Sequence, residues 1–252
     1  MRTLASSPAL RALCLTGLVA GFAIACAPAS LLDRGMERVS EGRIRLSTGQ
    51  GTLWRGSGLL VEREAGNFRP WADITWRFDF GELWRGRIAL ALAVDEQPPA
   101  RLLVSPRGFD LELPGTSLPL APLLRTLPHP AARLGWDGRL HAGGRLEHCS
   151  WAFACDGRLQ LTVDALSLDV LPDARLGRYR LDTQASAGSL RLVLASDEHN
   201  RLNASGEAEV MPGGFSKGEI TLAGERELLR QIGAMTADLA RPAADGALRV
   251  TW

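Results

Sequence analysis

The feature that most constrains the fold is an alternation of apolar and polar residues with a period of two, which begins near Arg43 and recurs to the end of the chain. This period places apolar side chains on one face of a β-strand and polar ones on the other. Gly, Pro, Asn and Asp separate about ten such segments. We therefore predict a mainly β fold, a curved antiparallel sheet with one apolar face. The alternation is clear in residues 44–46, 74–80, 88–94, 109–113, 159–163, 166–170, 190–194, 202–210 and 220–222.

A few short helices are expected beside this sheet. Residues 225–240 have helical spacing and are predicted to cover an end of the sheet. Residues 117–130 contain four prolines and leave room for one or two helical turns around 121–127. Residues 30–42 predict a helix that Ser30 caps and Gly42 ends, and that continues the preceding apolar segment as a stalk.

The N-terminal region contains an uncharged run at residues 12–32. Twenty-one helical residues span roughly 30 Å, the thickness of a bilayer core. Arg2 and Arg11 make the N-terminal flank positive, whereas the charges just after residue 32 sum to zero. The positive-inside bias predicts residues 1–11 in the cytoplasm, a transmembrane helix at 12–32 in the inner membrane, and a periplasmic β domain at 33–252.

Two alternatives to an uncleaved anchor remain open. Small residues around 25–29 are compatible with cleavage of a signal peptide. The segment ending at Cys26 also resembles a lipoprotein processing site, although Ala23 stands where a larger aliphatic residue is usual.

Cys149 and Cys155 lie close together in the predicted periplasmic part. In an oxidising compartment such a pair usually forms a disulfide, which we predict here. The alternative is a metal site that adds His141 and His148, but the adjacency of His148 and Cys149 suits tetrahedral zinc poorly. We expect no metal.

The tetrapeptide Leu-Trp-Arg-Gly occurs twice, at residues 53–56 and 83–86. Each copy leads into an alternating strand, and residues 134–146 contain a looser third copy with Trp136 and Gly138. Glycine permits a positive φ at a turn, and tryptophan covers the corner with apolar area. Arg55 and Arg85 are candidate partner contacts. The residues predicted to form structural corners are Gly51, Thr52, Leu53, Trp54, Gly56, Leu83, Trp84 and Gly86.

The sequence offers little for catalysis. Neither copy is a phosphate-binding loop, because the Gly-x-x-x-x-Gly-Lys pattern and a parallel βαβ context are both missing. None of the four histidines accompanies a Gly-x-Ser-x-Gly elbow. Asp33 and Glu37 are interpreted as ordinary surface charges. A net charge of +1 gives no reason to expect nucleic acid as a partner. We predict no enzyme, no catalytic residues and no cofactor.

In the order of its elements the chain resembles the type II secretion system protein N family. The resemblance rests on Pro28, Ala29 and Gly42 together with the corner residues 51–56, on "GWDGRL" in mid-chain, and on "LGRYRL", "RLNASGEAEV", "KGEITLAG" and the final "GALRVTW". It implies an accessory inner-membrane component of the machinery that exports folded proteins across the outer membrane, with other secretion proteins as partners. The resemblance does not extend to the cysteine pair or to the second tetrapeptide, which we do not assign to the family pattern.

Two functions follow from these observations. The first is a non-enzymatic scaffold that receives secretion proteins on strand edges or on the apolar face. The second is a lipid carrier, in which the apolar face forms a groove for acyl chains. They differ in what fills the apolar face: the chain's own side chains or a ligand.

Overall fold

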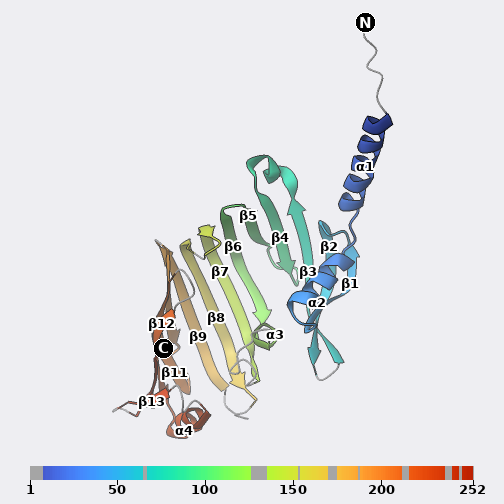
Figure 1. Cartoon of the computed structure of the whole chain (residues 1–252). Helices are drawn as coiled ribbons and strands as arrows, with labels where there is room; N and C mark the ends of the chain where they lie inside the picture. Colours follow the sequence, from blue (N-terminus) through green and yellow to red (C-terminus); the bar gives the residue numbers. More distant parts are fainter. Residues whose placement is uncertain are drawn as a thin grey trace. The chain divides into compact units, whose positions relative to one another are not determined.

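The computed structural model describes residues 8–64, 67–125, 135–152, 154–169, 175–186, 188–211, 216–235, 240–243 and 246–251. The chain divides into two compact units, Met1–Phe78 and Asp79–Trp252, called here the N-terminal and C-terminal units (Figure 1). Both are built on antiparallel β-structure with short helices, as the alternation predicts.

The N-terminal unit contains α1 (Pro8–Ala25), α2 (Ser30–Val39) and the strands β1 (Ile44–Gly51), β2 (Arg55–Glu64) and β3 (Asn67–Asp79). The strands pair in chain order. Their shared face buries Leu46, Leu60, Ile74 and Trp76. Large apolar side chains of α1 are exposed, among them Leu15, Leu18, Val19, Phe22 and Ile24.

Among the helices in the described ranges, none combines the length and the apolar character that crossing a membrane requires.

The prediction that residues 30–42 continue the preceding helix as a stalk is wrong. α1 ends at Ala25, and α2 is a separate helix that packs on β1. The segment between them lies against the β1–β2 turn, where Ala27 accepts a hydrogen bond from the N–H of Leu53 and Ala29 donates one to Gly51. Ser30 is not the cap either, because Ala29 holds that position and makes no side-chain cap.

The C-terminal unit begins with the 3-10 helix η1 (Phe80–Arg85) and continues as an antiparallel sheet. The sheet is not closed. Its strands pair in chain order except at the end, where β14 lies between β12 and β13. They are β4 (Ile88–Val94), β5 (Ala100–Ser105), β6 (Gly108–Pro119), β7 (Trp136–Ser150), β8 (Asp156–Leu168), β9 (Arg175–Ser186), β10 (Ser189–Ser196), β11 (Leu202–Val210), β12 (Ser216–Gly224), β13 (Ala240–Pro242) and β14 (Leu248–Thr251).

The register of these strands assembles one apolar face. Leu90 lies opposite Leu102, Leu102 opposite Leu111, and Leu111 opposite Leu146. Farther along the sheet, Leu161 pairs with Leu181, which in turn pairs with Leu194. Because paired residues share a face, the apolar positions that alternate in sequence align across the whole unit.

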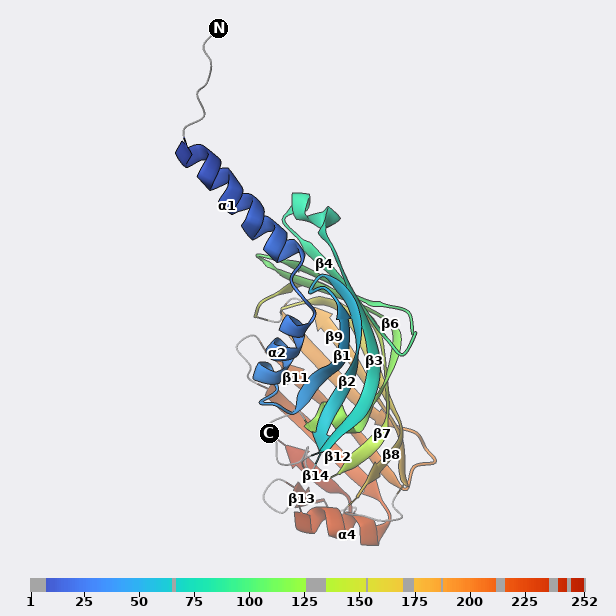
Figure 2. The ribbon, with the colours of Figure 1, turned by 90° about the vertical axis from the view of Figure 1, so that its right-hand side faces the viewer.

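Two short helices accompany this sheet, α3 (Leu120–Arg125) and α4 (Arg226–Met235). Figure 2 shows α4 at one end of the sheet, close to β12 and β13. Leu228 and Leu229 of α4 are buried with Leu176 and Leu202. The predicted covering helix is therefore confirmed at 226–235. Residues 236–239 lie outside the described residues, and Ala240 begins β13 instead of ending the helix.

Tyr179 closes this cluster with a polar contact. Its hydroxyl donates a hydrogen bond to the carbonyl oxygen of Leu202 at 2.6 Å. Burial raises the pKa of Tyr179 to about 12, so the hydroxyl stays protonated and remains a donor at neutral pH.

Candidate partner-binding turns

The first Leu-Trp-Arg-Gly copy forms the turn between β1 and β2. The hydroxyl oxygen of Thr52 accepts hydrogen bonds from the backbone N–H groups of Trp54 at 3.3 Å and Arg55 at 3.2 Å. The N–H of Thr52 donates to the carbonyl oxygen of Arg55 at 2.8 Å. Gly51 enters the turn with φ 93°, a conformation that favours glycine. The turn is thus closed by its own backbone, and Arg55 is exposed on it.

Trp54 ties this turn to the end of α1. Its indole Nε1–H donates to the carbonyl oxygen of Ile24 at 2.7 Å. Its ring meets Phe78 edge to face, with 5.7 Å between centroids. The aromatic ring spans the turn and the helix end, so it joins two segments that lie thirty residues apart in sequence.

A second tryptophan, Trp76, is not among the predicted corner residues but also supports the same turn. Trp76 is only 4% exposed, and its Nε1–H lies 3.2 Å from the carbonyl oxygen of Thr52 and 3.1 Å from that of Leu53. Gly56 pairs with Trp76 across the strands. A Cβ added at Gly56 would lie 2.6 Å from the Trp76 ring and 2.2 Å from the carbonyl oxygen of Gln50. Gly56 therefore provides space for Trp76, which the alternation in 74–80 could have indicated.

The second copy has a different structure. Leu83, Trp84 and Arg85 belong to η1, and Gly86 ends this helix with φ 69°. Trp84 does not cover the corner, contrary to the prediction, because it is 96% exposed. Leu83 is 49% exposed. Trp54 donates its indole N–H to the carbonyl oxygen of Ile24. In the described part of the chain, the Trp84 indole has no comparable acceptor and lies in the open.

Arg85 is paired locally. Its Nη1 lies 2.7 Å from a carboxylate oxygen of Glu82, and Nη2 of Arg87 lies 2.6 Å from the other. The hydrogen bond from Arg87 is the main reason why the pKa of Glu82 is lowered, and Arg85 adds to it. The Arg85 side chain is still 68% exposed and is accessible to a partner.

The looser third copy is not a corner. Trp136 is the first residue of β7, and it packs against the cluster that contains Leu168 and Leu176. Gly138, with φ 147°, lies where the register between β7 and β8 shifts. The three copies of this sequence motif therefore adopt three different local structures.

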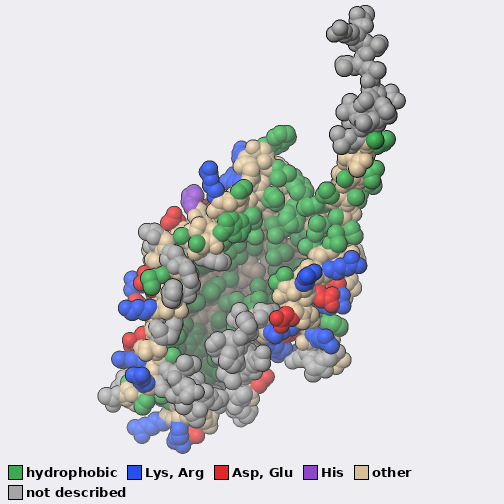
Figure 3. All heavy atoms as spheres, viewed as in Figure 1, with side chains coloured by type: hydrophobic (Ala, Val, Ile, Leu, Met, Phe, Trp, Pro, Cys, Tyr) green, Lys and Arg blue, Asp and Glu red, His purple; other side chains and the backbone are tan. Residues whose placement is uncertain are grey.

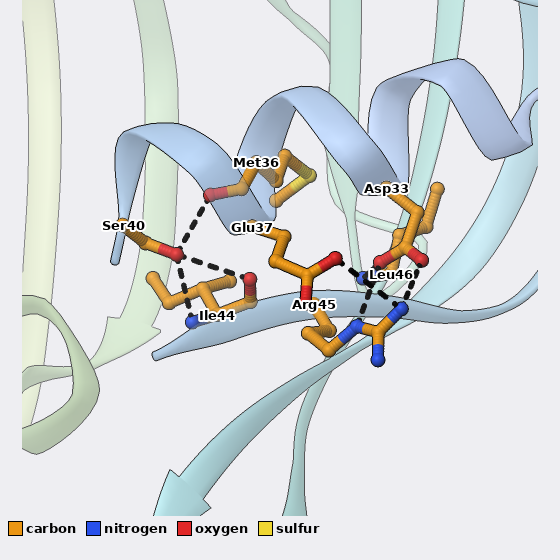
Figure 4. A network of polar contacts seen from close by, with 7 residues as sticks. All are labelled: Asp33, Met36, Glu37, Ser40, Ile44, Arg45 and Leu46. Atoms are coloured by element: carbon orange, nitrogen blue, oxygen red, sulfur yellow. Dashed lines mark hydrogen bonds and ion pairs between the residues drawn. The ribbon is translucent and has the colours of Figure 1, made fainter. Parts of the chain in front are cut away.

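Asp33 and Glu37 join α2 to β1, so their interpretation as ordinary surface charges is wrong (Figure 4). Asp33 accepts hydrogen bonds from Nη2 of Arg45 at 2.7 Å and from the backbone N–H of Leu46 at 2.9 Å. Glu37 lies 3.6 Å from the same guanidinium. At the far end of the helix, the Ser40 hydroxyl donates to the carbonyl oxygen of Met36 and accepts from the N–H of Ile44. The hydrogen bond from Arg45 is the main cause that lowers the pKa of Asp33.

We expect Asp33→Asn to release α2 from β1 and to lower the local free energy of unfolding by about 1–2 kcal/mol at neutral pH. The folded pKa lies below the unfolded value of about 3.9, so this contribution is complete at neutral pH. It is lost as the pH falls through the folded pKa, below about 4. Hydrogen exchange in α2 and β1 measures the effect at pH 7, and urea unfolding between pH 7 and 3 measures its pH dependence. Glu41→Gln, at a side chain that is 81% exposed, is the control; equal loss in both variants would contradict the assignment.

The predicted disulfide joins Cys149 to Cys155 at the β7–β8 turn. Both residues are buried with Leu146 and Ala185. The bond takes up both thiols that the alternative zinc site requires. In the described part of the chain, no three His, Cys, Asp or Glu side chains are grouped as metal ligands. His141 instead lies 3.2 Å from Asp164.

Replacing both bonded cysteines by alanine should destabilise the C-terminal unit by about 2 kcal/mol, because the bond closes a short loop. The midpoint of urea unfolding, followed by far-UV circular dichroism with and without reductant, gives the value. Cys26→Ala is the matched control, since this cysteine is free and exposed. An unchanged midpoint in the double variant would show that the bond contributes nothing.

Comparison with known proteins supplies the family. Searches among curated proteins and among solved structures found no match. A family model described as type II secretion system (T2SS), protein N, matches residues 42–251. The match begins just before β1 and extends through β14, so it includes both Leu-Trp-Arg-Gly turns and the whole sheet of the C-terminal unit. The chain belongs to the type II secretion system protein N family.

Proposed function

We propose that this protein is an accessory, non-enzymatic component of the type II secretion machinery, held at the inner membrane with its β-structure in the periplasm. The family match over residues 42–251 is the observation that carries the proposal. The family match supports a role in type II secretion. The membrane anchor, the topology and the partner contacts are proposed here on the grounds given below.

The N-terminal segment supports an anchor within residues 12–32. Leu15, Leu18 and Phe22 of α1 are 63%, 71% and 71% exposed, an arrangement that suits lipid better than water. Arg2 and Arg11 favour a cytoplasmic N-terminus. The disulfide of the C-terminal unit is in keeping with an oxidising compartment such as the periplasm.

Arg55 and Arg85 are the proposed contacts with other secretion proteins. Arg55 is exposed on a turn that Thr52 and Trp76 hold in one conformation. A rigid turn loses little entropy on binding, which favours recognition. Arg85 is exposed on η1, where Glu82 orients its guanidinium.

The test is site-specific photo-crosslinking in the native host, with a photoreactive amino acid at Arg85, at Arg55 and at Arg191. Arg191 is a control on the polar face of β10, with a side chain that is 61% exposed. We expect adducts to secretion proteins from Arg55 and Arg85, identified by mass spectrometry. Adducts to lipid alone, or the same adducts from Arg191, would refute the proposed contacts.

A further inference from the structure

Among the described residues, many apolar side chains on one face of the C-terminal unit's sheet are only half-buried. Its central side chains, such as Leu102, Leu111 and Leu192, are half-buried where the interior of a two-layered domain would bury them completely. Two buried clusters lie on this face, one around α4 near Leu176 and Leu202 and one around Leu146 and the disulfide. Side chains outside these clusters, such as Leu102 and Leu192, stay half-buried. Figure 3 shows hydrophobic side chains gathered on this face of the sheet.

The opposite face is suited to water. Arg101 pairs with Glu112, and Glu112 lies opposite Arg145, which bonds it at 2.7 Å. On β10 and β11, Arg191 and Glu207 form a further ion pair at 2.6 Å. Since the charged residues gather on one face, the half-buried face is left with aliphatic side chains and a few small or hydroxylated ones. Its occupant must therefore be apolar.

We propose that this face binds the acyl chains of a membrane lipid. Its backbone N–H and C=O groups are already used in the sheet, as the register from β4 to β12 shows. An extended peptide lying on the face would find few partners for its own backbone groups, at a large cost in free energy. An alkyl chain has no such groups to satisfy.

The dimensions of the face fit this ligand. Adjacent strands lie about 4.8 Å apart, so the nine strands from β4 to β12 extend over roughly 38 Å. One leaflet of the hydrocarbon core is about 15 Å thick, half of a bilayer core. The face is therefore wide enough for the acyl chains of more than one lipid.

A row of strand ends and turns on one side of the same sheet, called this edge below, has the chemistry of a lipid–water interface. The start of β4, the β5–β6 turn and the β7–β8 turn follow one another along this edge, because Ile88 pairs with Val104 and Gly108 pairs with Ser150. Two tryptophans are exposed there, Trp84 at 96% and Trp151 at 58%.

Polar groups complete this edge. The Trp151 Nε1–H donates to the carbonyl oxygen of Pro106 at 3.1 Å, beside the exposed Arg107. Tryptophan and arginine together are typical of sites at the level of lipid head groups, and arginine complements a phosphate. The lipid's anionic head group is assigned to this edge.

The experiment uses the full-length protein in membranes that contain phosphatidylglycerol with a diazirine at the end of one acyl chain. After irradiation, labelled residues are mapped by mass spectrometry. We expect label on apolar-face residues of β5, β8 and β10. Label within α1 reports the anchor separately, so the inference can fail while the proposed anchor stands, and the reverse.

Leu192 and Val193 provide a matched pair, because they are neighbours on β10, are both half-buried, and point to opposite faces. Leu192→Glu should reduce labelling of the face by about tenfold, because a charge then lies among the acyl chains, whereas Val193→Glu should leave it nearly unchanged. Leu192→Thr is a milder variant, and circular dichroism checks folding. Label confined to α1, or equal losses in both glutamate variants, would overturn the proposal.

Discussion

Replacing Trp76 by alanine is expected to lower the free energy of unfolding of the N-terminal unit by about 3–5 kcal/mol. The side chain is 4% exposed and packs over Gly56 of β2, so the change leaves a cavity on that face of the sheet. It also removes the indole donor that serves the carbonyl oxygens of Thr52 and Leu53. The β1–β2 turn then loses its support, and Arg55 its fixed position. Hydrogen exchange in peptides from β1 to β3, measured on the full-length protein, reports the local free energy.

Trp84→Ala is the matched control, because it makes the same substitution in a side chain that is 96% exposed. We expect a change within about 0.5 kcal/mol. Trp76→Phe should fall between the two, since it keeps most of the volume and loses only the donor. If Trp84→Ala destabilised the protein as much as Trp76→Ala, the burial of the two rings in this structure would be wrong.

The alternation predicted the sheet because period-two patterning is set by one buried face. β4 and β10 follow it closely. The alternation does not predict β5, because Leu102, Leu103 and Val104 are consecutive apolar residues that obscure the period of two. The alternation predicts two segments at 159–163 and 166–170, yet β8 runs through the first and into the second with a register shift after Val163. A bulge moves the alternation by one residue without ending the strand.

The polar contacts that organise the turns cannot be predicted from the sequence, because they join residues that lie far apart in it. Asp33 and Arg45 lie on different elements, and only the packing of α2 on β1 brings them together. The same holds for Trp76 and the carbonyl oxygens of the turn, more than twenty residues apart. The disulfide can be predicted from the sequence, because two cysteines only six residues apart are necessarily close in space.

Gly56→Ala is expected to cost about 3 kcal/mol or more, whereas Gly86→Ala should cost only about 1 kcal/mol. Both glycines end a Leu-Trp-Arg-Gly copy, but their surroundings differ. At Gly56 the added Cβ meets a backbone oxygen at 2.2 Å and a buried ring at 2.6 Å, so β1 or Trp76 must move. At Gly86 nothing lies within 4 Å, and the cost is that of holding alanine at φ 69°.

This pair separates two reasons for a glycine in the same motif. If positive φ were what both copies required, Gly86→Ala would be the more harmful change, because only Gly86 of the two has a positive φ. If close packing dominates, Gly56→Ala is the worse, and Trp76→Ala should relieve part of its cost, since the added methyl then has space. Urea unfolding of the two single variants and of the Gly56→Ala/Trp76→Ala double variant measures this coupling. Additive losses in the double variant would show that Gly56 is not there to admit Trp76.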